Sequence, residues 1–180
     1  QISKIAQTAG ISPKRAELLY RITDYFQPKN ILEIGTSLGL ATSALSLGNP
    51  NTAITTLEGC PETSGVAQKQ FCEFGFSNIK TEVTEFSSYL KKSQLSTFDF
   101  IYFDGNHSKQ ATLDYFELLL PTITNNTIWI FDDIHWSIDM EEAWRIIQDH
   151  PKVTVTIDTF QWGLVCFRHE QEKEHFVIRA

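Results

Sequence analysis

Short apolar runs alternate with amphipathic stretches along most of this 180-residue chain, and this alternation limits the fold more than any other feature. The apolar runs are rich in β-branched and aromatic residues, and each ends near a glycine or a polar residue, as buried strands do. Their regular spacing is typical of parallel strands joined by helices. We expect strands at residues 30–35, 53–58, 79–83, 98–104 and 127–133.

The stretches between these runs carry helix signals. Ser12 is suited to cap a helix that has Pro13 at its first position and apolar residues at helical spacing as far as Phe26. Further helices are expected at 38–48, 61–75, 86–93, 108–120 and 138–149. Two strand-like runs, 153–160 and 163–169, flank Gln161 and Trp162 and predict an antiparallel hairpin.

One domain accounts for this order of elements. We expect an N-terminal helical segment over residues 1–29 and a three-layer α/β domain of Rossmann-like form over 30–180. Five parallel strands and the hairpin together make a mostly parallel, seven-stranded sheet. The antiparallel hairpin distinguishes it from the dinucleotide-binding dehydrogenases, whose sheets are usually wholly parallel.

The charge balance argues against nucleic acid as a partner, since 15 Lys and Arg residues stand against 22 Asp and Glu residues. The three cysteines lie far apart without a CxxC pair, which favours free thiols in a reducing compartment. No apolar run approaches the roughly 20 residues that span a bilayer. We therefore expect a soluble, cytoplasmic protein that does not bind membranes.

Ligands of parallel sheets bind beyond the carboxyl ends of the strands, so the residues after each strand are the candidate site. The first strand leads into a loop from Gly35 to Gly39, before a helix N-terminus with free N–H groups. The second strand ends in Glu58, an acid placed to accept hydrogen bonds from a ribose. The loop lacks the glycine spacing that a dinucleotide requires. A turn without a ligand and a solvated Glu58 are the alternatives.

Two other strand ends carry carboxylates. Asp104 ends the fourth strand, with His107 three residues later, and Asp132 and Asp133 end the fifth. Because neighbouring strands lie about 4.8 Å apart, these carboxylates can converge on a divalent cation such as Mg²⁺. Alternatively, both adjacent aspartates cap the helix that follows.

A resemblance to a known family rests on four stretches: ILEIGTSLGLATSALS, ITTLEGCPE, FDFIYFDGNHSKQATLDYFELLLP and IWIFDDIHW. In order and spacing they resemble the motifs of class I S-adenosylmethionine-dependent O-methyltransferases, over roughly residues 30–168. The similarity is greatest to the metal-dependent branch, which includes catechol O-methyltransferase and the sugar O-methyltransferases of methyltransferase family 24. Ser37 departs from the glycine-rich form of the first motif, at its middle glycine position.

The resemblance implies a transferase that moves a methyl group from S-adenosylmethionine to a hydroxyl of a small molecule, either a sugar or a phenol, with help from Mg²⁺ or a similar cation. The implied cofactor residues are Glu33, Gly35, Thr36, Ser37 and Gly39 around the methionine part, Glu58 at the ribose, and Thr84, Glu85 and Phe86 beside the adenine. The implied metal ligands are Asp104, Asp132 and Asp133, although catechol O-methyltransferase usually has an amide at the last position.

The expected catalytic residues are Asp104 and His107. The ordinary pKa of histidine, near 6.5, suits His107 for taking the acceptor's proton at neutral pH. His135 is a weaker candidate base, and Trp136 is expected to pack in the core instead of lining the acceptor pocket. The alternatives are a metal-independent methyltransferase with His107 as base, a methyltransferase-like binding module and, least favoured, an NAD(P)-dependent oxidoreductase. The acceptor and any homo-oligomer stay open.

Overall fold

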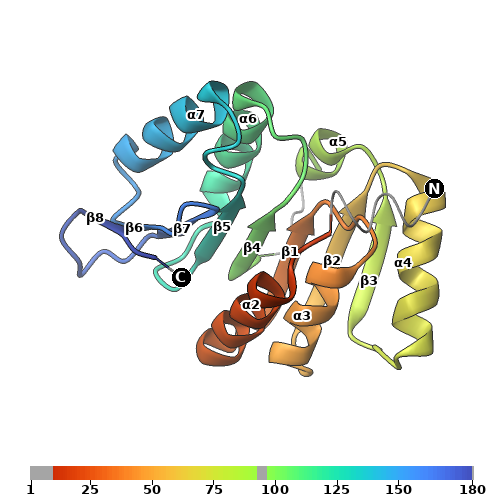
Figure 1. The fold of residues 1–180 in the computed structure, drawn as a ribbon. Helices are drawn as coiled ribbons and strands as arrows, with labels where there is room; N and C mark the ends of the chain where they lie inside the picture. The colour runs from red at the N-terminus through yellow and green to blue at the C-terminus, as the bar shows by residue number, and fades with distance from the viewer. Residues whose placement is uncertain (1–9, 93–96, 180) are drawn as a thin grey trace. The chain divides into compact units, whose positions relative to one another are not determined.

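A computed structural model describes residues 10–92 and 97–179, and the chain divides into two compact units, Gln1–Phe86 and Ser87–Ala180 (Figure 1). The first unit contains α2 (Pro13–Phe26), β1 (Asn30–Ile34), α3 (Leu40–Gly48), β2 (Ala53–Glu58), α4 (Pro61–Glu73) and β3 (Ile79–Val83). Helix α5 (Phe86–Leu90) starts at the boundary between the units. The second unit continues with β4 (Phe100–Phe103), α6 (Lys109–Leu119), η1 (Leu120–Thr122), β5 (Ile128–Asp132), α7 (Ile138–Asp149), β6 (Val155–Asp158), β7 (Trp162–Cys166) and β8 (Glu174–Val177).

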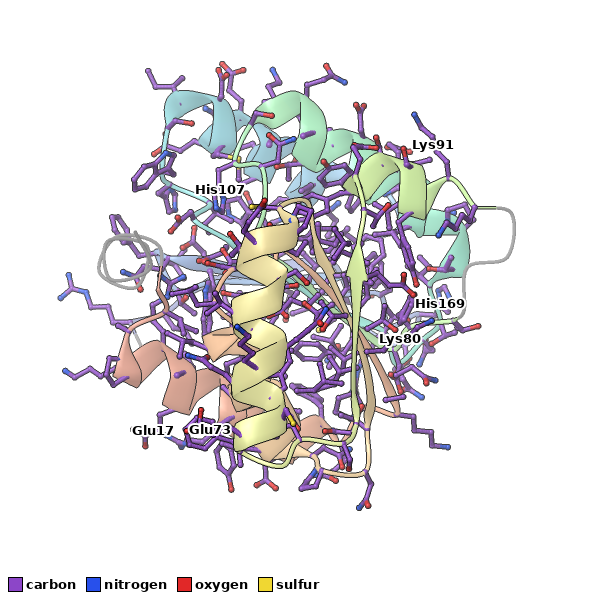
Figure 2. The ribbon with its side chains drawn as sticks, turned by 90° about the vertical axis from the view of Figure 1, so that its right-hand side faces the viewer. Glu17, Glu73, Lys80, Lys91, His107 and His169 are labelled. Atoms are coloured by element: carbon purple, nitrogen blue, oxygen red, sulfur yellow. The ribbon has the colours of Figure 1, made fainter. Side chains whose placement is uncertain are left out.

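The strands of the first unit are parallel, in the order β3, β2, β1. Their register places Glu33 of β1 opposite Thr56 of β2, and Glu58 at the end of β2 opposite Val83 of β3. Figure 2 shows α4, with Glu73 at its C-terminal end, running beside β3, which carries Lys80. The parallel strands and the helices between them confirm the expected βα series.

Helix α2 begins as its sequence predicts. Ser12 is the N-cap, and its hydroxyl accepts a hydrogen bond from the N–H of Arg15.

Helices α2 and α3 pack so closely that a Cβ on Gly48 would lie 2.6 Å from the carbonyl oxygen of Tyr20. A residue larger than glycine would therefore push the two helices apart.

In the second unit, β4 and β5 are parallel, and β7 pairs antiparallel with both β5 and β6. Figure 1 shows α6 and α7 side by side, and residues of the two helices contact each other. Aromatic side chains fill the core here: Trp129 is fully buried, and the rings of Phe103 and Phe131 stack with their centroids 4.2 Å apart. These features confirm the α/β class, with a mostly parallel sheet and a C-terminal antiparallel hairpin.

The structure differs from the expected hairpin in two respects. Trp162 was expected in the turn, which is wrong: it is the first residue of β7, pairs with Asp132 and is buried. The turn instead spans residues 159–161, and the N–H of Thr159 donates to the carbonyl of Trp162 across it. Strand β8 adds a parallel neighbour to β6, so the sheet in the described part of the chain has eight strands and not the expected seven, and all four residues of β8 are exposed. No helix in the described parts of the chain has both the length and the apolar character needed to cross a membrane.

Candidate functional site

The loop between β1 and α3 is a tight turn fastened to the end of β2. The N–H groups of Gly35 and Thr36 both donate to the carbonyl oxygen of Leu57, each at 3.0 Å. Gly39, the N-cap of α3, has a φ of 80°, a left-handed conformation that favours glycine. A Cβ there would also lie 2.6 Å from the ring of Phe71. Gly39 is thus required both by the backbone and by packing, and it brings no side chain to cap α3.

The Glu58 carboxylate joins this loop to the start of α4. Its Oε2 accepts a hydrogen bond from the N–H of Ser37 at 2.8 Å, and its Oε1 accepts one from the N–H of Cys60 at 2.9 Å. Glu58 is therefore held in place, which argues against the solvated alternative. Each carboxylate oxygen has a second lone pair with which it can accept another hydrogen bond.

Ser37, which departs from the glycine of the family motif, takes the conformation that a glycine would. Its φ is 48°, in the left-handed region. This conformation costs serine more than glycine, but the N–H of Ser37 donates a hydrogen bond to Glu58 that helps to hold it. The departure therefore leaves the turn intact.

The stretch expected beside the adenine starts next to Glu58. The N–H of Thr84 donates to the carbonyl oxygen of Glu58 at 2.9 Å, directly after the β2–β3 pairing ends. The hydroxyl of Thr84 donates to the carbonyl of Glu85. The first unit thus brings the glycine loop, Glu58 and the 84–86 stretch to one edge of its sheet, as the motif order predicts.

Glu33 lies inside the protein, with no exposed surface. Its Oε2 accepts hydrogen bonds from the hydroxyls of Thr42 and Thr56, and the hydroxyls of Thr56 and Thr36 lie 2.6 Å apart. Burial raises the pKa of Glu33 to about 7, although the two threonine hydrogen bonds act to lower it; the charge of Glu58 adds to the rise. Nothing in the sequence pattern indicates this threonine cluster.

Asp132 is buried at the end of β5, where its Oδ2 accepts a hydrogen bond from the hydroxyl of Tyr102 and its Oδ1 one from the N–H of Asp133. Asp133 has a φ of 54°, and its carbonyl accepts the N–H of Trp136 across a turn. The N-cap of α7 is Ser137. The alternative that both aspartates cap this helix is therefore wrong.

Asp104 and His107 lie together after β4. The Nε2 of His107 is 3.7 Å from the Oδ1 of Asp104, and both side chains are partly exposed. Figure 2 labels His107 on the loop between β4 and α6. Ser108 caps α6, so His107 lies in the loop before the helix and is not its first residue. Residues 10–92 and 97–179 contain no group of three or more His, Cys, Asp or Glu side chains that could hold a metal ion.

His135 has a carboxylate partner at each ring nitrogen. Its Nε2 lies 2.9 Å from Asp158 and its Nδ1 lies 3.2 Å from Glu141. Burial alone would lower the pKa of His135, but the hydrogen bonds and charges of Asp158 and Glu141 outweigh it and raise the pKa. Since both nitrogens are engaged, His135 is poorly placed to take a proton from an acceptor.

Trp136 and Asp158, which lie near His135 in the sequence and in the structure respectively, differ from their expected environments. Trp136 was expected in the core, which is wrong, since 71% of its surface is exposed. Asp158 was not among the expected site residues; it ends β6 and is buried. Its Oδ2 also accepts a hydrogen bond from the indole N–H of Trp144. In the sequence, Asp158 lies inside the expected strand 153–160, so no strand-end signal marks it; its hydrogen bond with His135 appears only in the structure.

Two comparisons by sequence agree with this arrangement. A family model described as "Methyltransferase domain" matches residues 32–134. A catechol O-methyltransferase from Niastella koreensis is 29% identical over 130 residues, which are 69% of this chain and 58% of that protein. The chain thus spans less than two thirds of the length of this relative.

Solved structures share the fold at low sequence identity. Cofactor-bound Rv0187 from MTB superposes with a TM-score of 0.80 at 19% identity, covering 93% of this chain and 86% of that one. The O-methyltransferase TomG from Streptomyces achromogenes, in complex with SAM, gives a TM-score of 0.76 at 20% identity, covering 93% and 89%. SAH-bound PaMTH1 from Podospora anserina gives 0.76 at 19% identity, covering 88% and 80%. With the family model matching more than half of its length, the chain belongs to the family of methyltransferase domains.

Proposed function

We propose that the chain is an S-adenosylmethionine-dependent O-methyltransferase that acts on a small molecule. The observation that carries the proposal is the position of Glu58, which the amides of Ser37 and Cys60 hold beside the glycine loop. A fixed acid at the end of the second strand is suited to bind the two hydroxyls of a ribose. The similarity to a catechol O-methyltransferase supports the same activity.

The proposed cofactor site lies within the first unit. Gly35, Thr36, Ser37 and Gly39 would surround the methionine part, with the uncapped N-terminus of α3 beside them. Glu58 would accept hydrogen bonds from the ribose. The 84–86 stretch, which starts at the Glu58 carbonyl, would border the adenine.

The chemistry needs a methyl donor, a positioned hydroxyl and a proton acceptor. S-adenosylmethionine bound at this site would supply the methyl group to the acceptor oxygen, with S-adenosylhomocysteine as the leaving group. His107 would take the proton of the acceptor hydroxyl. Asp104, whose Oδ1 lies 3.7 Å from the Nε2 of His107, would orient the imidazole. Holding the reactants in line would supply much of the rate enhancement.

The sequence also predicts a divalent cation. Asp104, Asp132 and Asp133 have the hard oxygen ligands that Mg²⁺ prefers. However, the described residues form no group of three metal ligands, and both oxygens of Asp132 already accept hydrogen bonds. The three side chains do not fit a cation as they are arranged, so we assign no step to one. Cation binding stays a prediction, and His107 acting without a metal is the second candidate.

The acceptor is proposed to be a hydroxyl of a sugar or a phenol, on the ground of the family resemblance. A cytoplasmic location is proposed because Cys60, Cys72 and Cys166 are free thiols, which suit a reducing compartment.

Calorimetric titration with S-adenosylhomocysteine, and separately with NAD, tests the cofactor. We expect S-adenosylhomocysteine to bind the wild type and to bind Glu58→Gln at least tenfold more weakly, with no binding of NAD. Binding of NAD alone would refute the proposal in favour of an oxidoreductase.

Two further measurements test the chemistry. Asp104→Ala should abolish methyl transfer and retain the binding of S-adenosylhomocysteine. A domain that only binds a partner would show no transfer in the wild type. Exhaustive chelation followed by addition of Mg²⁺ tests the cation: a loss of transfer that Mg²⁺ restores would support cation binding, whereas unchanged transfer would support His107 acting alone.

A further inference from the structure

Glu33 has an environment that differs from that of a ligand-binding carboxylate. It has no exposed surface, and one of its oxygens accepts the hydroxyls of Thr42 from α3 and Thr56 from β2. The hydroxyl of Thr56 lies 2.6 Å from that of Thr36, in the loop between β1 and α3. One carboxyl group therefore joins β1 to β2, to the start of α3 and to the loop.

This environment disfavours a negative charge. Among the described residues, no Lys, Arg or His forms an ion pair with Glu33, and its Oε1 has no hydrogen-bond partner. The charged group that acts on it within its own unit is the Glu58 carboxylate, which repels a second negative charge. A buried anion with an unpaired oxygen and a like charge nearby is costly, whereas a neutral acid avoids most of that cost.

We infer that Glu33 is a positioning residue that acts as an uncharged acid, holding the cofactor loop through the three threonines and not binding the cofactor as a carboxylate. The inference rests on the proposed function, because the loop matters through the cofactor that it binds. Ionisation of Glu33 places a buried negative charge beneath the loop, with one carboxylate oxygen unpaired and the Glu58 carboxylate nearby, and lowers the affinity for the cofactor.

The inference fixes the direction of a pH effect. Because burial raises the pKa of Glu33 to about 7, cofactor affinity falls as the pH rises through that value. If only the uncharged form binds well, the fall between pH of about 6 and about 8.5 reaches up to about 30-fold. A carboxylate that bound the cofactor's ammonium group would produce the opposite trend, with affinity rising over the same range.

Three variants separate these cases. Glu33→Gln keeps the shape and removes the titration, so its affinity should stay within about threefold of the wild type near pH 6 and show no fall at higher pH. Thr42→Val removes a hydrogen bond that lowers the pKa of Glu33, so the midpoint of the fall should move to higher pH. Thr42→Ser keeps the hydroxyl and should keep the midpoint, which makes it the matched control.

The experiment is calorimetric titration of the whole chain and the three variants with S-adenosylhomocysteine across this pH range. Affinity that rises with pH and is lost in Glu33→Gln would overturn the inference, as would affinity that does not change with pH in the wild type. If Glu33→Gln fails to fold, the comparison of Thr42→Val with Thr42→Ser decides. If Thr42 has only a structural role, Thr42→Val changes the affinity but not the pH midpoint of its fall. Absence of binding at every pH would refute the proposed function, and the inference with it.

Discussion

Replacing Gly39 with Ala tests the geometry of the cofactor loop most directly. The added methyl group would face the Phe71 ring at 2.6 Å and the Ala67 Cβ at 3.2 Å, both on α4. At a φ of 80°, it would also force an L-residue into the left-handed region. Gly39→Ala therefore disturbs both the loop and its contact with α4.

The size of the effect follows from these two costs. A left-handed L-residue costs about 1–2 kcal/mol, and inserting a methyl group into a packed contact costs about 1–3 kcal/mol. Alanine also reduces the conformational freedom of the unfolded chain, which offsets about 0.4–1 kcal/mol of these costs. We expect Gly39→Ala to lower the free energy of unfolding by about 3 kcal/mol and to weaken the binding of S-adenosylhomocysteine.

Gly65→Ala is the matched control, because Gly65 lies within α4 and an added Cβ meets nothing within 4 Å. The same chemical change should raise the free energy of unfolding there by about 0.5–1 kcal/mol. Urea unfolding measures both effects, and Phe71→Leu should relieve part of the Gly39→Ala cost in a double-mutant cycle. A loss of less than about 1 kcal/mol in Gly39→Ala would refute the reasoning, as would additive effects in the cycle.

Three other predictions concern stability. Gly163→Ala should cost about 1–3 kcal/mol in urea unfolding, because its Cβ would lie 2.6 Å from the Trp144 ring; a neutral result would contradict that contact. Because the pKa of His135 is raised in the folded protein, protonation of His135 stabilises the fold below its ordinary pKa of 6.5, and this stability is lost as the pH rises through the higher folded value. Melting curves should therefore show a melting temperature that falls with pH over this range, and Asp158→Asn should reduce the fall. Because folding raises the pKa of Glu33 from 4.5 to about 7, the free energy of unfolding should fall by about 3 kcal/mol as the pH rises between those values. Glu33→Gln should remove this dependence on pH in urea unfolding measured across the range. An unchanged slope in either variant would contradict the assigned group.

Most elements of the fold were predictable because the signals behind them are local. The five parallel strands and the helices between them lie within a few residues of the expected positions, since apolar runs and cap residues act over short stretches of chain. Two errors have the same origin. Trp162 belongs to a strand and is buried, and Trp136 is exposed, because of which other parts of the folded chain pack against them.

The sequence by itself determined which residues follow each strand, and therefore that Gly35, Gly39 and Glu58 come to one edge of a parallel sheet. Only the tertiary structure decided the electrostatics. Burial raises the pKa of Glu33, while threonine hydroxyls from two other elements act to lower it, and Asp158, 23 residues away in the chain, forms a hydrogen bond with His135. The physical reason is that periodicity and caps act within one element, whereas burial and hydrogen bonding depend on side chains that folding brings together from distant parts of the chain.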